Sequence, residues 1–130
     1  MSQQQTIGRY RILERIASGS QGRVHQAYDP ETGQIVALKV LHSHLTDDIA
    51  YVERFLREAS LASQVDHPNV VKIFEGGRDG DQFFISMEYL PQSLARILEG
   101  GSQMEPEQAA SFGIQIAEGL AAAHARRVIH

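Results

Sequence analysis

The chain has 130 residues and a mass of 14.4 kDa, enough for one small domain of the usual size of about 100–200 residues. Twelve Lys and Arg against sixteen Asp and Glu give a formal charge of −4, so no basic excess predicts binding to nucleic acid or to an anionic membrane. No apolar run reaches the roughly 20 residues that span a bilayer, and no secretory leader is recognisable, so we expect neither a membrane-spanning nor a secreted protein.

The cysteine and histidine content narrows the kinds of site that the chain can carry. With no Cys, a disulfide framework and a thiolate metal site are excluded, and a reducing, cytoplasmic location is expected. Six scattered His include no His-Glu-x-x-His spacing, so we expect no metal site among these residues.

The first part of the chain has the pattern of a sheet. Residues 1–7 are mostly polar and are expected to be a flexible terminus. Beyond them, alternation and apolar runs are broken by a Gly/Ser cluster at residues 18–22 and by a reverse turn at residues 29–33. The pattern predicts three antiparallel strands, over residues 10–16, 23–28 and 35–41.

Helical spacing follows after Asp47 and Asp48, which suit a helix N-terminus and its dipole. The residue before Pro68 avoids the helical conformation, so this helix ends ahead of it. One arc of the helix is apolar and comprises Val52, Phe55, Leu56, Ala59 and Ala62. We then expect two strands around a turn at residues 76–81, a short helix and a longer one, over residues 70–74, 82–90, 93–99 and 106–126.

A glycine-rich turn between two strands lets backbone N–H groups approach an anion without obstruction by side chains. The spacing here is Ala17-x-Gly19-x-x-Gly22-x-Val24. Taken alone, such a turn more often only reverses the chain.

Lys39 interrupts the apolar run of the third strand and is either solvated or inward-facing. An inward ammonium needs a carboxylate or phosphate partner, because an unpaired buried charge is costly. Glu58 lies on the following helix about 60° from Phe55, at the margin of the apolar arc. A Lys39–Glu58 ion pair is therefore a plausible interpretation, and a solvated position for each residue is the alternative.

The order of these features resembles the N-terminal lobe of a eukaryotic-type protein kinase, and some phrases resemble its bacterial Ser/Thr branch. The resemblance covers residues 7–130. Its motifs, in order, are the glycine loop, Val36-Ala37-Leu38-Lys39, Arg57-Glu58, His67-Pro68-Asn69-Val70-Val71, Met87-Glu88-Tyr89-Leu90 and Ala123-His124-Ala125-Arg126-Arg127-Val128-Ile129-His130. The bacterial phrases are Gly8-Arg9-Tyr10-Arg11-Ile12 and Ala122-Ala123-His124-Ala125-Arg126.

The resemblance implies an α+β fold, with a five-stranded antiparallel sheet and one main helix followed by the first helices of an incomplete C-lobe. It divides the chain into a flexible terminus, a nucleotide-binding N-lobe and the start of the C-lobe, at residues 1–7, 8–90 and 91–130. The remaining C-lobe is then expected to cover the apolar face of the 106–126 helix.

The resemblance also implies a role for each site residue. Lys39 and Glu58 are the implied catalytic residues, Lys39 holding the α- and β-phosphates of ATP and Glu58 orienting it. The implied nucleotide-binding residues are Ile16, Ala17, Gly19, Gly22, Val24, Ala37, Lys39, Met87 as gatekeeper, and the backbone of Glu88 and Leu90. The implied partners are ATP with Mg²⁺ and a protein substrate.

Several positions depart from the family pattern. Ala17 replaces the first glycine of the loop, His25 stands where an aromatic is usual, Arg127 replaces a frequent glycine, and the linker after Leu90 is about one residue short. His130 is the implied first residue of the His-Arg-Asp motif, so the catalytic Asp and the Mg²⁺ ligands are expected beyond residue 130. We therefore expect the 130 residues alone to be inactive.

Three functions remain open at this stage. The first is the N-terminal part of a Ser/Thr protein kinase. The second is a non-catalytic nucleotide- or partner-binding module of the pseudokinase kind. The third is a binding domain that shares only the strand and glycine-turn pattern.

Overall fold

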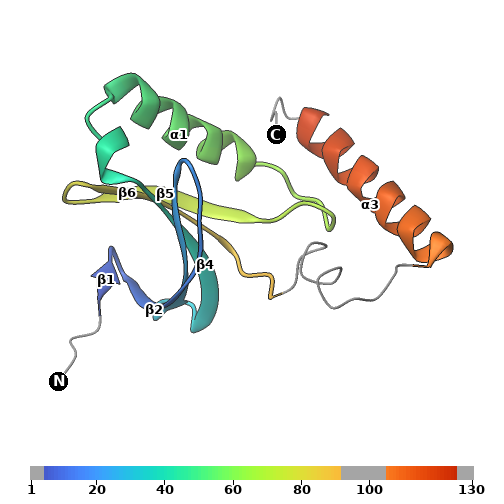
Figure 1. Ribbon diagram of the computed structural model, residues 1–130, viewed down its shortest axis with the longest axis horizontal. Helices are drawn as coiled ribbons and strands as arrows, with labels where there is room; N and C mark the ends of the chain where they lie inside the picture. Colours follow the sequence, from blue (N-terminus) through green and yellow to red (C-terminus); the bar gives the residue numbers. More distant parts are fainter. Residues whose placement is uncertain (1–4, 92–104, 126–130) are drawn as a thin grey trace.

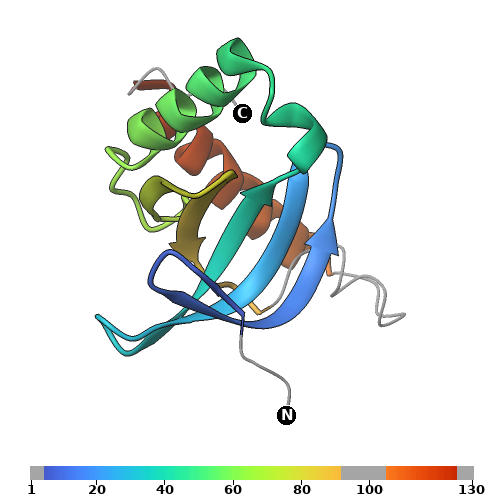
Figure 2. The ribbon, with the colours of Figure 1, turned by 90° about the vertical axis from the view of Figure 1, so that its left-hand side faces the viewer.

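The computed structural model describes residues 5–91 and 105–125. One antiparallel sheet, with the strand order β1-β2-β3-β4-β6-β5, carries helix α1 on one side, and helix α3 lies beside it (Figures 1 and 2). The strands are β1 Thr6–Ile7, β2 Tyr10–Ser18, β3 Gly22–Asp29, β4 Gln34–Leu41, β5 Ile73–Asp79 and β6 Gln82–Glu88. The helices are a short 3-10 turn at Ser43–Leu45, α1 Ile49–Ala62 and α3 Pro106–Ala125. This architecture confirms the α+β fold class.

The sheet has six strands where five were expected, because the chain already pairs at Thr6 and Ile7. Gly8 adopts a φ of 59°, which closes a tight turn into β2, and Ile7 is fully buried. The expectation of a flexible terminus is therefore wrong for these two residues. A two-residue strand is too short to show an alternating pattern, which is why the sequence did not reveal it.

Strand β5 also differs from its prediction, since it begins at Ile73 and runs through the glycines that were assigned to a turn. A Cβ on Gly76 would lie 3.3 Å from Leu56 of α1, and one on Gly77 would lie 2.7 Å from the Phe84 ring. These glycines therefore serve close packing inside a strand, and the reversal itself is made at Gly80, with a φ of 59°.

The starts of both long helices agree with their sequence signals. Asp48 is the N-cap of α1, and its carboxylate accepts a hydrogen bond from the Tyr51 N–H at 3.2 Å. Helix α3 begins at Pro106, as expected for proline at a first helical position. The predicted 93–99 helix lies outside the described residues. Within the described ranges, no helix is both long and apolar enough to cross a membrane.

Each face of the sheet buries its own apolar cluster. On one face, a core closes around the N-terminal hairpin and consists of Ile7, Tyr10, Ala27, Val36, Leu38, Val40 and Phe84. On the other face, α1 packs through Val52, Phe55 and Ala59 against Leu41 and Ile85. Because directly paired residues of antiparallel strands share a face, Lys39, which pairs with Ile85, lies on the α1 side of the sheet.

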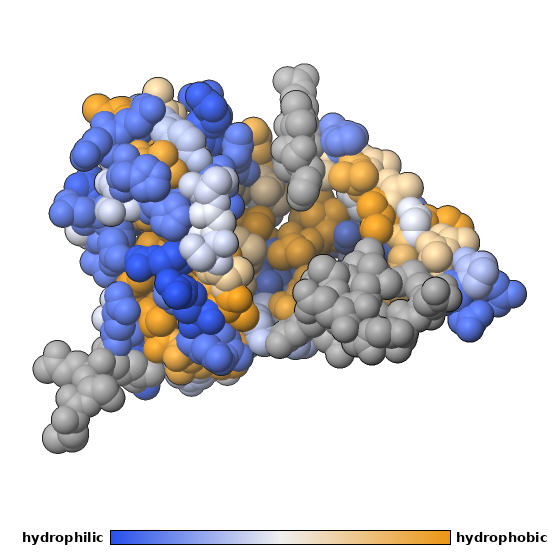
Figure 3. Space-filling model, in the orientation of Figure 1, coloured by the Kyte–Doolittle hydropathy of each residue, from blue (hydrophilic) through white to orange (hydrophobic). Residues whose placement is uncertain are grey.

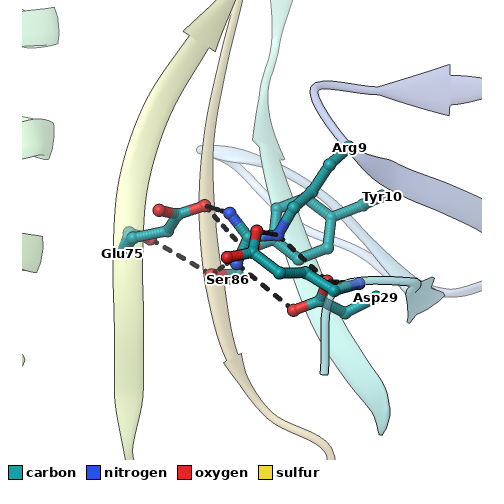
Figure 4. A network of polar contacts seen from close by, with 6 residues as sticks. Arg9, Tyr10, Asp29, Glu75 and Ser86 are labelled. Carbon is teal, nitrogen blue, oxygen red and sulfur yellow. Dashed lines mark hydrogen bonds and ion pairs between the residues drawn. The ribbon is translucent and has the colours of Figure 1, made fainter. Parts of the chain in front are cut away.

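A polar network fastens the N-terminal hairpin to the sheet (Figure 4). The Arg9 guanidinium donates to the buried Asp29 carboxylate at 2.9 Å and 3.2 Å and to Glu75 at 3.0 Å. The Tyr10 hydroxyl contacts Glu75 at 2.7 Å and Ser86 at 2.9 Å, and burial raises the pKa of Tyr10 to about 12. The network joins residues of the N-terminal hairpin, β3, β5 and β6.

We predict that Arg9→Ala lowers the free energy of unfolding by about 1–3 kcal/mol, because the buried Asp29 carboxylate loses its cationic donor. Urea unfolding at pH 7.5 measures this change. Arg11→Ala is the matched control, since among the described residues the Arg11 side chain forms no ion pair or hydrogen bond and lies 5.9 Å from the Tyr28 ring. It should change stability by less than about 0.5 kcal/mol. Equal losses in the two variants would contradict a structural role for the network.

His25, on β3, is buried at 8% exposure, and its Nδ1 has no hydrogen-bond partner. Burial lowers the pKa of His25 below its usual value, and the charges of Arg23 and Arg15 lower it further. In the unfolded chain the pKa of such a histidine is about 6.5, so the imidazole takes up a proton more readily there than in the folded chain.

Stability should therefore fall as the pH falls from 7.5 to 5.5, because the unfolded chain binds more protons there. We predict that His25→Phe reduces this pH dependence, by at most about 1.4 kcal/mol per pH unit. Urea unfolding at the two pH values measures it. The exposed His124 offers the control His124→Phe, and an identical pH dependence in the two variants would refute the assignment to His25.

Candidate functional site

Strand register brings five of the predicted site residues to one face of the sheet. Val24 of β3 pairs with Lys39 of β4, and Ala37 of β4 pairs with Met87 of β6. Ala17 of β2 pairs with Val24, so it lies on the same face. The central strands thus align a small residue, a cation and apolar side chains along one strip beside α1.

The remaining predicted apolar contacts lie at the edges of this strip. Ile16 falls at a register shift of β2 and is 42% exposed. Ala37 is buried at 7% exposure, Met87 is half-buried, and Leu90 is 53% exposed just beyond β6. A surface with a small buried floor and exposed apolar rims suits a flat ring system.

Glu88, the last residue of β6, is hydrogen-bonded to Lys72, the residue before β5. The Glu88 N–H donates to the Lys72 carbonyl at 2.8 Å, and the Glu88 carboxylate accepts from the Lys72 N–H at 3.3 Å. These two bonds hold the segment that leads out of β6 towards Leu90.

The glycine hairpin between β2 and β3 folds against the end of β4. The Gly19 N–H donates to the Gly22 carbonyl at 2.9 Å, and the His42 N–H donates to the Gln21 carbonyl at 2.9 Å. The His42 ring nitrogen Nε2 lies 2.6 Å from the Gly19 carbonyl oxygen. His42 was not among the predicted site residues, since a histidine after an apolar strand carries no recognisable signal.

The two loop glycines are needed for different reasons. A Cβ on Gly22 would lie 2.0 Å from the Val40 carbonyl oxygen, so only glycine allows β3 to approach β4 there. A Cβ on Gly19 would meet nothing within 4 Å. Gly22 therefore has a packing role in this structure, while a side chain at Gly19 would meet open space.

Lys39 is half-buried, and the expected ion pair with Glu58 is not formed. The Lys39 ammonium donates instead to the Gln21 side-chain carbonyl, at 2.5 Å. Glu58 is exposed on α1, and no ion pair joins it to Lys39. Burial lowers the pKa of Lys39, while the nearby charge of Glu58 raises it, so the carboxylate lies within electrostatic reach.

The difference follows from where α1 presents Glu58. Val52, Phe55 and Ala59 face the sheet, and Glu58 sits beside this apolar stripe with its side chain in solvent. The helical periodicity placed Glu58 correctly at the margin of the apolar arc of α1. Periodicity alone could not decide whether a carboxylate at this margin turns inward. The hairpin tip supplied a nearer, neutral partner.

Helix α3 approaches the loop between α1 and β5. A Cβ on Gly119 would lie 2.6 Å from the Asn69 carbonyl oxygen, and the Asn69 side chain donates to Glu118 at 3.3 Å. A hollow of about 290 Å³ is lined by residues of this loop, of the end of β6 and of α3, and apolar residues gather there (Figure 3). Among the apolar residues of α3, Ile114, Ile116 and Leu120 are 40–60% exposed.

Among residues 5–91 and 105–125, no group of three or more His, Asp or Glu could hold a metal ion. His130, the implied first residue of the His-Arg-Asp motif, lies outside the described residues, as does the linker that follows residue 91.

Comparisons with known proteins agree with this geometry. The family model for the protein kinase domain matches residues 10–130. Serine/threonine-protein kinase pkn2 of Myxococcus xanthus is 42% identical over 124 residues, which are 95% of this chain and 15% of pkn2. Serine/threonine-protein kinase PrkC of Bacillus subtilis is 35% identical over 124 residues, which are 95% of this chain and 19% of PrkC.

A solved structure shows the same fold. The crystal structure of the Mycobacterium tuberculosis PknI kinase domain superposes with a TM-score of 0.82 at 22% identity, over 97% of this chain and 51% of that one. The chain thus spans about half of that kinase domain and less than a fifth of the two kinases above. With a kinase family match over nearly its whole length, and with the strand register and helix placement described above, the chain belongs to the protein kinase domain family.

Proposed function

We propose that this chain is the N-terminal part of a serine/threonine protein kinase and that its sheet binds ATP beneath the glycine hairpin. In the longer protein, the γ-phosphoryl group of ATP is transferred to a Ser or Thr hydroxyl of a protein substrate. The observation that carries the proposal is the strip of Ala17, Val24, Ala37, Lys39 and Met87 on one face of four neighbouring strands.

Lys39 is the proposed ligand of the α- and β-phosphates. Its ammonium is half-buried at the middle of the sheet, and burial lowers its pKa. A polyanion bound beside it favours the charged form and replaces the solvation that burial removes. Glu58 is the proposed positioning residue, since its charge already acts on Lys39 and a small shift of α1 would shorten the distance between them.

The apolar part of the strip is the proposed adenine site. Ile16 and Val24 lie towards the hairpin, Ala37 provides the buried floor, and Met87 lies beside it at the back. The backbone of Glu88 and Leu90 is proposed to hydrogen-bond the adenine edge. A small residue at position 37 leaves room for a flat ring against the sheet.

Mg²⁺ and the catalytic base are not assigned to these residues. In the family, a catalytic-loop Asp accepts the substrate proton, and an Asn and the Asp of Asp-Phe-Gly hold the metal. The motifs that would carry them follow the position matched by His130. We therefore propose that a polypeptide of these 130 residues binds nucleotide but does not transfer phosphate.

We predict that Lys39→Met weakens ATP binding by about tenfold or more, because the phosphates lose their buried cation, while adenosine binding changes little. Calorimetric titration of the 130-residue chain with ATP and with adenosine measures both affinities. Lys72→Met is the control, since Lys72 is exposed outside the strip and its loss should leave both affinities unchanged.

An ATP affinity that Lys39→Met does not alter would contradict the proposed site and favour a binding domain that shares only the strand pattern. A radiolabel transfer assay tests the second part of the proposal. Phosphorylation of a protein substrate by the 130-residue chain, abolished by Lys39→Met, would refute its inactivity.

A further inference from the structure

We propose that Gln21 is a positioning residue that holds the Lys39 ammonium while no nucleotide is bound and releases it to the phosphates of ATP. The inference rests on the proposed nucleotide site and names a residue outside the assigned set. In the absence of nucleotide, the neutral side chain of Gln21 takes the place of the phosphates as the hydrogen-bond acceptor of Lys39.

The first support is the need of Lys39 for a partner. A half-buried ammonium loses part of its hydration, and an unmatched charge of this kind is costly. The Gln21 side-chain carbonyl is the hydrogen-bond acceptor that the structure gives to this ammonium. The carboxylate that a kinase-like site would use, Glu58, remains exposed and outside ion-pair distance.

The second support is the way the backbone delivers Gln21 to the lysine. The Gln21 carbonyl accepts from the His42 N–H at 2.9 Å, and the Gly19 carbonyl lies 2.6 Å from the His42 ring. Next to Gln21, Gly22 packs directly on the Val40 carbonyl, one residue beyond Lys39. These contacts hold the tip against the end of β4, within reach of the Lys39 side chain.

The third support is the chemistry of the exchange. A glutamine carbonyl satisfies an ammonium hydrogen but brings no negative charge, so its bond is weaker than one to an ionised acceptor. Phosphate oxygens supply both the acceptor and the charge, and they replace the glutamine without displacing an ion pair. The lost Lys39–Gln21 bond then reduces the apparent affinity for ATP, but not for a ligand without phosphates.

The test is titration of the 130-residue chain with ATP and with adenosine. Gln21→Ala removes the competitor and should tighten ATP binding by about three- to tenfold. Gln21→Glu gives Lys39 a charged partner and should weaken ATP binding by about tenfold. Neither change should alter adenosine binding. Gln34, exposed at the far end of β4, provides the controls Gln34→Ala and Gln34→Glu, which should leave ATP affinity unchanged.

A second background separates exchange at Lys39 from a general effect on the hairpin. In Lys39→Met, Gln21→Ala should leave ATP affinity unchanged, because no ammonium remains to be released. An equal gain in both backgrounds would overturn the inference. So would an unchanged ATP affinity in Gln21→Ala when Lys39→Met alone weakens binding, and in that case the proposed nucleotide site would stand.

Amine labelling without nucleotide tests the contact by itself. Trinitrobenzenesulfonate reacts with free amines, and peptide mass spectrometry compares Lys39 with the exposed Lys72 as an internal standard. Gln21→Ala should raise the relative rate at Lys39 by about threefold, and Gln21→Glu should lower it. Rates that stay equal in the three proteins would overturn the inference, even if ATP binding depends on Lys39.

Discussion

The candidate site is organised around a cation held half-buried in the middle of an antiparallel sheet. Lys39 lies between strands whose other face is a closed apolar core, and paired neighbours fix its position on the side of α1. Because strand pairing fixes its backbone, the partner of the ammonium is set by the groups that reach it from neighbouring elements. The nearby groups offer a neutral amide from the hairpin and a carboxylate from the helix.

The two faces of the sheet are therefore covered differently. One is sealed by the N-terminal hairpin, with the Tyr10 ring edge-on to Phe84 and the Arg9–Asp29 pair at its margin. The other carries the strip of candidate ligand-binding residues, beside which lie the glycine hairpin and the exposed Glu58 carboxylate. A closed apolar core thus lies behind the strands that carry the strip.

Glycines allow elements near this site to approach closely at three places. Gly22 lies on the Val40 carbonyl, Gly76 lies under α1, and Gly119 brings α3 against the Asn69 carbonyl. At each of these positions the missing side chain lets the neighbouring element approach the glycine backbone. Each contact therefore sets the distance between two elements. The loop at Asn69 thereby couples the position of α1 to that of α3, across the hollow beside the end of β6.

The sequence by itself determined the positions of the central strands and both long helices, and the face shared by Ala37 and Lys39, because these follow from local periodicity and caps. The α+β class was implied by the resemblance of its motifs to the kinase family. Only the tertiary structure decided the short β1, the packing role of Gly76 and Gly77, and the choice of Gln21 over Glu58 as the partner of Lys39. Those outcomes depend on distances between segments remote in sequence. A periodic pattern fixes which face a side chain occupies, whereas its partner is set by how closely hairpin, strand and helix approach one another.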